Sequence, residues 1–104
     1  MSDTVDAPRN PPSLVGKRAL VTGAARGIGA RTAEMLVREG AEVAVHARRR
    51  EQLDDIAASI HALGSEAICV TGDLTAAKSI AKLCAQAIKE LGGIDIVINN
   101  AGVA

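Results

Sequence analysis

The sequence predicts an α/β fold in which a parallel sheet is flanked by helices. Four short apolar segments typical of buried strands alternate with three longer segments whose apolar residues recur at helical spacing. Consecutive parallel strands need long, right-handed crossovers, which the helical segments supply. With 104 residues the chain holds one domain at most. We expect that domain over residues 16–104, after a disordered arm at residues 1–15 that is polar and contains all three prolines.

Glycines and apolar periodicity set the boundaries of these segments. The strands are expected at residues 17–22, 42–47, 66–71 and 94–98. The first two helices are expected at residues 27–39 and 50–63, each followed by a glycine that can end it. The apolar face of the first is expected to hold Ile28, Ala33, Leu36 and Val37. The third helix has its apolar stripe from Ile80 to Leu91, and Thr75 is its expected N-cap.

Composition excludes several classes of function. Twelve basic and twelve acidic residues give a net charge of zero, and there is no Phe, Tyr or Trp, so no nucleic-acid partner is expected. No apolar run approaches the ~20 residues of a membrane span, and the start of the chain lacks the apolar core of a secretory signal. We therefore expect a cytoplasmic protein with no membrane partner. Cys69 and Cys84 are expected to be buried thiols, and His46 and His61 to have core or surface roles without a metal.

A glycine-rich segment, TGAARGIG at residues 22–29, joins the first strand to the first helix. Glycine permits positive φ angles and a close approach of the backbone to a ligand. The free N–H groups and the dipole at the start of a helix attract an anion. With a strand before it and a helix after it, the segment predicts a pyrophosphate-binding loop, and the alternative is a tight turn without a ligand.

The spacing of that loop, G-x-x-x-G-x-G, and three further segments resemble the short-chain dehydrogenases/reductases. Asp73-Leu74 follows the third strand, Asp95 is expected in the fourth, and Asn99-Asn100-Ala101-Gly102 follows the fourth. The resemblance covers about residues 16–104 and is strongest to NADPH-using members such as 3-oxoacyl-carrier-protein reductases. It implies a Rossmann-like sheet of strand order 3-2-1-4, flanked by helices and truncated after the fourth strand.

The resemblance also implies roles for individual residues. The backbone of Gly23, Gly27, Ile28 and Gly29 would face the pyrophosphate, with Ala25 and Arg26 in the same loop. Asp73 would bind the adenine amino group, with Leu74 beside the ring, although an Asp at this place can also simply terminate a strand at a turn. Asn100, Ala101 and Gly102 would line the adenosine ribose and the floor near the nicotinamide, and Asn99 would tie strands together.

The residues at the end of the second strand favour NADP(H) over NAD(H). Enzymes that use NAD place an acidic residue there for the ribose 2′-hydroxyl, whereas this sequence has Ala47 followed by Arg48. An arginine can pair with a 2′-phosphate that a carboxylate would repel, and Arg26 can approach from the glycine loop. The alternative is that Arg48, Arg49 and Arg50 only solvate the start of the next helix.

No catalytic residue is expected in this chain. The family that it resembles catalyses with Ser, Tyr and Lys located after the N-N-A-G segment, and the sequence contains no Tyr. We therefore expect the cofactor-binding half of an NADP-dependent short-chain oxidoreductase, whose own activity stays open. The alternatives are a non-catalytic nucleotide-binding module, or a fragment that pairs with a complementary chain or with itself. In the last case an open edge of the fourth strand and an apolar patch beside the third helix would form the contact.

Overall fold

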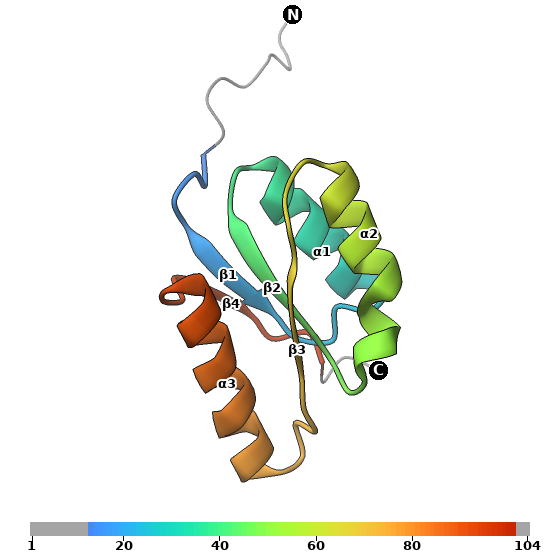
Figure 1. Cartoon of the computed structure of the whole chain (residues 1–104), viewed down its shortest axis with the longest axis vertical. Coiled ribbons are helices and arrows are strands. Elements are labelled where there is room, and N and C mark those ends of the chain that lie inside the picture. Colours follow the sequence, from blue (N-terminus) through green and yellow to red (C-terminus); the bar gives the residue numbers. More distant parts are fainter. Residues whose placement is uncertain (1–12, 102–104) are drawn as a thin grey trace, which may run out of the picture.

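A computed structural model of the chain describes residues 13–101, and its four strands form one parallel sheet (Figure 1). The strands are β1 (Arg18–Val21), β2 (Glu42–Ala47), β3 (Ile68–Thr71) and β4 (Ile96–Ile98). The helices are α1 (Gly27–Arg38), α2 (Asp54–Ala62), which follows the 3₁₀ turn η2 (Arg50–Leu53), and α3 (Ala77–Leu91). The strand order is β3-β2-β1-β4, so the expected order 3-2-1-4 is confirmed.

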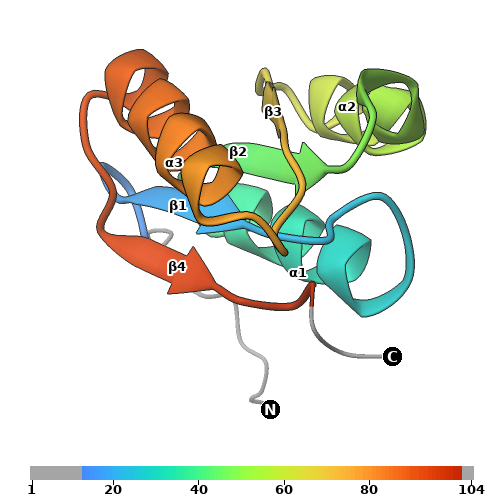
Figure 2. The same cartoon turned by 90° about the horizontal axis from the view of Figure 1, so that it is seen from below.

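The helices α1 and α3 lie on opposite sides of the sheet (Figure 2), which separates two apolar cores. Successive side chains of a strand point to opposite faces of the sheet. Val43 and Val45 therefore lie in the core beneath α1 and α2, whereas Ala44 lies in the core beneath α3. The α3 core is closed by Leu83, Ala87 and Leu91, which lie at helical spacing. Two helices thus cover one face of the sheet, and a single helix covers the other.

The face beneath α3 keeps large apolar side chains in contact with solvent. Ile96 and Ile98 pack toward α1, so the intervening Val97 points to the α3 side and is 59% exposed. On α3 itself, Ile80 and Ile88 are 39% and 49% exposed. The apolar surface expected beside the third helix is present among the described residues.

Three expectations about the elements were wrong. Thr75 does not cap α3, which starts at Ala77 with Ala76 as its N-cap, because the Thr75 hydroxyl donates to Asp73 instead. Asp95 precedes β4 and does not belong to it. Ile28 does not lie on the buried face of α1 but is 69% exposed.

The start of the described chain also differs from the expected arm. Residues 13–16 form a turn in which the Leu14 N–H donates to the Glu39 carbonyl at 2.8 Å, and the Leu14 side chain packs against the core. The arm expected at residues 1–15 therefore does not extend through its last three residues. Residues 1–12 lie outside the described part of the chain.

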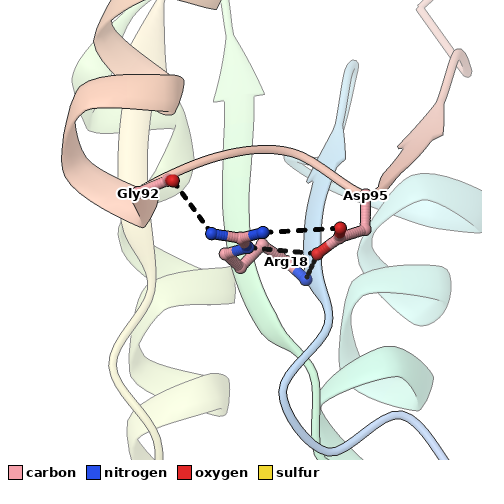
Figure 3. A network of polar contacts seen from close by, with 3 residues as sticks. All are labelled: Arg18, Gly92 and Asp95. Atoms are coloured by element: carbon pink, nitrogen blue, oxygen red, sulfur yellow. Dashed lines mark hydrogen bonds and ion pairs between the residues drawn. The ribbon is translucent and has the colours of Figure 1, made fainter.

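At the amino ends of the strands, Arg18 joins β1, α3 and the start of β4 (Figure 3). Its backbone N–H, Nε and Nη2 donate to the Asp95 carboxylate at 2.9, 3.1 and 3.4 Å, and Nη1 donates to the Gly92 carbonyl at 2.8 Å. These hydrogen bonds hold the pKa of Asp95 below its usual value. Because Gly92 caps α3, the guanidinium also lies at the negative end of that helix dipole. We call Arg18, Gly92 and Asp95 the amino-end network.

Candidate functional site

A cleft of about 730 Å³ lies at the opposite end of the sheet, where the carboxyl ends of the strands meet. Parallel α/β sheets bind their ligands at this edge. The cleft is lined by Gly23, Ala25, Arg26, Gly27, Ile28, His46, Ala47, Arg48, Gln52, Asp73, Leu74, Thr75, Asn100 and Ala101. Ten of the predicted site residues lie here, Gly29 lies beneath the wall, and Gly102 lies outside the described residues.

The start of α1 offers uncapped backbone amides to the cleft. Arg26 is the N-cap residue, and its side chain makes no capping hydrogen bond. Within residues 13–101, the N–H groups of Gly27, Ile28 and Gly29 have no acceptor. Gly27 has φ of 64°, a conformation that favours glycine, and its Cα faces open space. These amides and the helix dipole form the anion-binding arrangement that the loop predicts.

Gly23 lines the cleft, but unlike Gly27 and Ile28 its backbone polar groups have partners. Its N–H donates to Nδ1 of His46 at 3.1 Å, and its carbonyl accepts from Nδ2 of Asn100 at 3.0 Å. Both polar groups of its backbone therefore already have hydrogen-bond partners inside the protein, and the facing of Gly23 toward a pyrophosphate stays a prediction. The positive φ of 61° at Gly23 turns the chain toward α1.

Gly29 has a packing role that its position in the motif does not reveal. A Cβ atom at this position would lie 2.2 Å from the carbonyl oxygen of Gly23 and 2.7 Å from Nδ2 of Asn100. Real Cβ atoms do not approach so closely, so the absence of a side chain lets α1 sit against the glycine loop. Gly29 is buried and does not line the cleft, but its N–H group is one of the free amides at the start of α1.

Thr22 joins the ends of β1 and β4 beneath the cleft. Its hydroxyl oxygen accepts from the N–H groups of Asn100 and Ala101 at 3.0 and 3.2 Å and lies 3.3 Å from Oδ1 of Asn99. The expectation that Asn99 ties strands together is confirmed by this contact. Thr22 is 6% exposed, and sequence reasoning assigned it no such role.

Asp73 has the turn-forming role that was one of the two roles left open by the sequence. Its Oδ1 accepts from the hydroxyl and the N–H of Thr75 at 2.6 and 2.9 Å, which forms a turn after β3 and lowers the pKa of the carboxyl group. The second oxygen accepts no hydrogen bond from a donor within residues 13–101 and remains available in the cleft. Leu74, beside it in the cleft wall, also packs against the α3 core.

The three consecutive arginines after β2 divide into two groups. Arg49 pairs with Glu51 at 3.0 Å and Arg50 with Asp54 at 3.7 Å, so for these two the solvating role holds. Arg48 lines the cleft without an ion pair among the described residues, and the same is true of Arg26 in the glycine loop. Ala47 stands at the end of β2, so no carboxylate opposes an anion there.

Four lining residues were absent from the predicted site. They are His46, Ala47, Gln52 and Thr75. His46 is 2% exposed, as a core histidine should be, but its ring reaches the glycine loop. His61 is exposed and lies 2.6 Å from Glu66, which confirms its expected surface role.

The described residues contain neither a metal-binding cluster nor a membrane-spanning helix. No group of three or more His, Cys, Asp or Glu side chains within residues 13–101 could hold a metal ion. None of the described helices is long and apolar enough to cross a membrane. Cys69 and Cys84 are free and partly buried, and desolvation raises the pKa of the Cys69 thiol.

Comparison with known proteins identifies the family. A family model described as short chain dehydrogenase matches residues 17–104. Gluconate 5-dehydrogenase of Gluconobacter oxydans is 44% identical over 91 residues, covering 88% of this chain and 36% of that protein. Tetrahydroxynaphthalene reductase of Pyricularia oryzae is 40% identical over 104 residues, covering 97% and 37%.

The solved structures agree in fold. A metagenomic short-chain oxidoreductase in complex with NADP matches with a TM-score of 0.77 and 39% identity, over 82% of this chain and 38% of that one. The fold is therefore Rossmann-like, and the chain spans little more than a third of the lengths of the relatives it matches. The chain belongs to the short-chain dehydrogenase/reductase family of oxidoreductases, and it corresponds to the N-terminal part of the family's members.

Proposed function

We propose that the cleft binds NADP(H) and that the chain is the cofactor-binding part of an NADP-dependent short-chain oxidoreductase. One observation carries the proposal. Arg48 and Arg26 line the same cleft from two sides without ion pairs among the described residues, and Ala47 occupies the end of β2. The relative that was solved with NADP supports the choice of cofactor.

The residues present fit the pyrophosphate, the 2′-phosphate and the adenine of the dinucleotide. The free amides at the start of α1 suit the pyrophosphate. The two guanidinium groups suit a 2′-phosphate, which a guanidinium can bind with two parallel hydrogen bonds. The free oxygen of Asp73 can accept from the adenine amino group, and Leu74 offers an apolar surface for the ring.

The cofactor supplies a hydride for reduction of a carbonyl, or accepts one from an alcohol. The residues described here bind and orient it, and Asn100 and Ala101 form the part of the cleft floor that follows β4. Protonation of a forming alkoxide needs a general acid. The family uses a tyrosine for this, and the 104-residue sequence contains none. The proposed role of this chain is therefore cofactor binding.

Arg48→Ala tests the choice of cofactor. Wild type should bind NADP more tightly than NAD, and the substitution should narrow that preference by roughly 1.5–3 kcal/mol, the scale of a charge-assisted hydrogen bond. Arg48→Asp should shift the preference toward NAD, because a carboxylate accepts from a 2′-hydroxyl. Isothermal titration of each variant with both dinucleotides measures the effect.

Arg49→Ala is the matched control, because Arg49 is paired with Glu51 and does not line the cleft. It should leave the ratio of the two affinities unchanged. Equal affinities of wild type for NAD and NADP would contradict the proposed preference.

We also propose that β4 mediates association, either with a second copy or with a complementary polypeptide. β4 pairs with β1 on one side and with no other strand of the described residues, and Val97 on it is 59% exposed. Such an edge offers unpaired backbone groups beside an apolar surface. Size exclusion with light scattering on the 104-residue chain should give a mass above that of a monomer, and Val97→Lys should reduce it. A sharp monomer peak for wild type would refute self-association.

A further inference from the structure

The imidazole of His46 is held between two backbone groups from different parts of the sheet. Nδ1 accepts the N–H of Gly23 at 3.1 Å, and Nε2 lies 2.9 Å from the carbonyl oxygen of Gly72. An N–H can only donate and a carbonyl oxygen can only accept, so Nδ1 carries no proton and Nε2 carries one. The structure therefore assigns a neutral imidazole with a single tautomer to a side chain that is 2% exposed.

The two hydrogen bonds connect opposite walls of the cleft. Gly23 begins the glycine loop, and Gly72 directly precedes Asp73 and its turn with Thr75. The backbone of His46 adds a third link, because its carbonyl accepts the N–H of Ala24 at 2.8 Å. β2 lies between β1 and β3 in the sheet, so one residue at its end can reach both neighbours.

Loss of the ring would remove one hydrogen bond from each wall and leave the backbone links from His46 to Ala24 and from Gly72 to Ala47 in place. The N–H of Gly23 would lose its acceptor in a partly buried place, and the carbonyl of Gly72 would lose its donor. Leaving such groups without partners favours rearrangement of the loop toward water. The glycine loop carries the start of α1, so its displacement would move the amides that face the pyrophosphate.

Resting on the proposed function, we propose that His46 is a positioning residue of the dinucleotide site. Its ring holds the glycine loop and the Gly72–Asp73 segment in one fixed arrangement before the cofactor binds. Because both dinucleotides share the pyrophosphate and the adenine, the role is independent of the 2′-phosphate. Substitution of His46 should lower the affinity for NAD and for NADP by the same factor, whereas substitution of Arg48 should change their ratio.

Three variants separate the two hydrogen bonds. In His46→Asn, the amide oxygen takes the place of Nδ1 and can accept from Gly23. In His46→Gln, the amide nitrogen takes the place of Nε2 and can donate to Gly72. His46→Leu keeps the bulk and loses both. We expect an affinity loss of roughly tenfold or more for Leu, since buried groups lose their partners. Rescue by Asn to within about threefold of wild type is expected, because it retains the bond to the loop.

Isothermal titration with NAD and NADP measures the affinities, and ¹⁵N NMR of the unliganded 104-residue chain reads the tautomer of His46. His61→Gln leaves a single histidine, so the assignment is direct. A predominant Nε2–H tautomer, together with equal losses for both dinucleotides, supports the proposal. Should His46→Leu fail to fold, the comparison of Asn and Gln with wild type carries the test.

The same titrations distinguish a failure of the proposed function from a failure of the proposed role of His46. If wild type binds dinucleotide and all His46 variants bind it equally well, His46 is no positioning residue while the proposed function stands. A predominant Nδ1–H tautomer overturns the assignment in the same way. If wild type binds neither NAD nor NADP, the proposed function fails and the role of His46 toward a dinucleotide fails with it.

Discussion

The two ends of β1 show opposite ways of treating polar groups. At its amino end, Arg18 directs its side-chain donors to Asp95 and Gly92. Beyond its carboxyl end, the glycine loop leads to amides at the start of α1 that have no acceptor within the described residues. Polar groups that are hydrogen-bonded to one another hold elements together, whereas donors without a partner in a cleft are available to a ligand. The amino end therefore holds a stabilising network alone. The carboxyl end has stabilising hydrogen bonds of Thr22 and His46 as well, and in addition the free donors at which we propose that a ligand binds.

Gly29→Ala should have the largest effect, because its new Cβ atom would clash with the glycine loop at the carboxyl end of the sheet. The new Cβ meets a backbone oxygen that cannot move aside as a flexible side chain can. We expect the free energy of unfolding to fall by about 1–3 kcal/mol, the scale of an overpacked interior, and dinucleotide binding to weaken as well. Chemical denaturation measures the first effect and titration the second. Arg31→Ala, at an exposed position of the same helix, should change stability by less than about 0.5 kcal/mol; a similar loss in both variants would contradict the steric explanation.

Asp95→Asn should act on the amino end alone. The variant should be less stable than wild type at neutral pH, because the three hydrogen bonds from Arg18 lose their charged acceptor and one carboxylate oxygen is replaced by an amide NH2, which cannot accept. It should bind dinucleotide with unchanged affinity. The pKa of Asp95 is lowered in the folded state. Its contribution is therefore present above the unfolded pKa of about 3.9 and is lost as the pH falls through the folded pKa.

Denaturation of wild type and Asp95→Asn from pH 7 to pH 2 measures this dependence. The difference in stability should be constant above about pH 5 and shrink below pH 4, by the linkage of protonation to folding. The pair is about one-third exposed, so salt should also reduce the difference. A difference that does not change with pH would show that the charge of Asp95 is not what stabilises the network.

Thr75→Ala should have the smallest effect, which is confined to the pKa of Asp73 in the cleft. The hydroxyl of Thr75 is the main cause of the lowered pKa of Asp73, so its removal should move that pKa back toward the usual value. NMR titration of the Asp73 carboxyl group measures the shift, and Ser at position 75 is the control, because it retains the hydroxyl. No change in the pKa of Asp73 would refute the assignment of this hydrogen bond.

Much of the fold was predictable, because its signals are local. Alternating apolar runs predicted all four strands, and the glycine spacing with Arg48 and Asp73 predicted where the cleft lies. Ile28 was misplaced for a physical reason. Helical periodicity assigns every apolar residue to the core. It does not show that the first turn of α1 lies at the cleft, where Ile28 is exposed.

The contacts that sequence reasoning missed are made between distant residues and the backbone. His46 binds Gly23 and Gly72, which lie 23 and 26 positions away. Every residue type has a backbone N–H or carbonyl group, so a backbone partner cannot be recognised in the sequence. A single His in an apolar strand therefore gives no sign of these hydrogen bonds. Thr75 was misassigned because its hydroxyl can act in two ways. It can accept from the N–H groups at a helix start or donate to Asp73, and the sequence does not rank these two roles.

The amino-end network also bears on how the chain folds. Arg18 and Asp95 are 77 positions apart, and β1, the first strand of the described chain, pairs with the last. Closing so long a loop has a larger entropic cost than closing a short crossover, and such non-local pairing slows folding. The unit β1-α1-β2 can assemble from near neighbours, whereas the network must wait for the final strand. On a ribosome, where synthesis proceeds from the amino terminus, one edge of the central strand β1 would stay unpaired until residues 95–98 emerge.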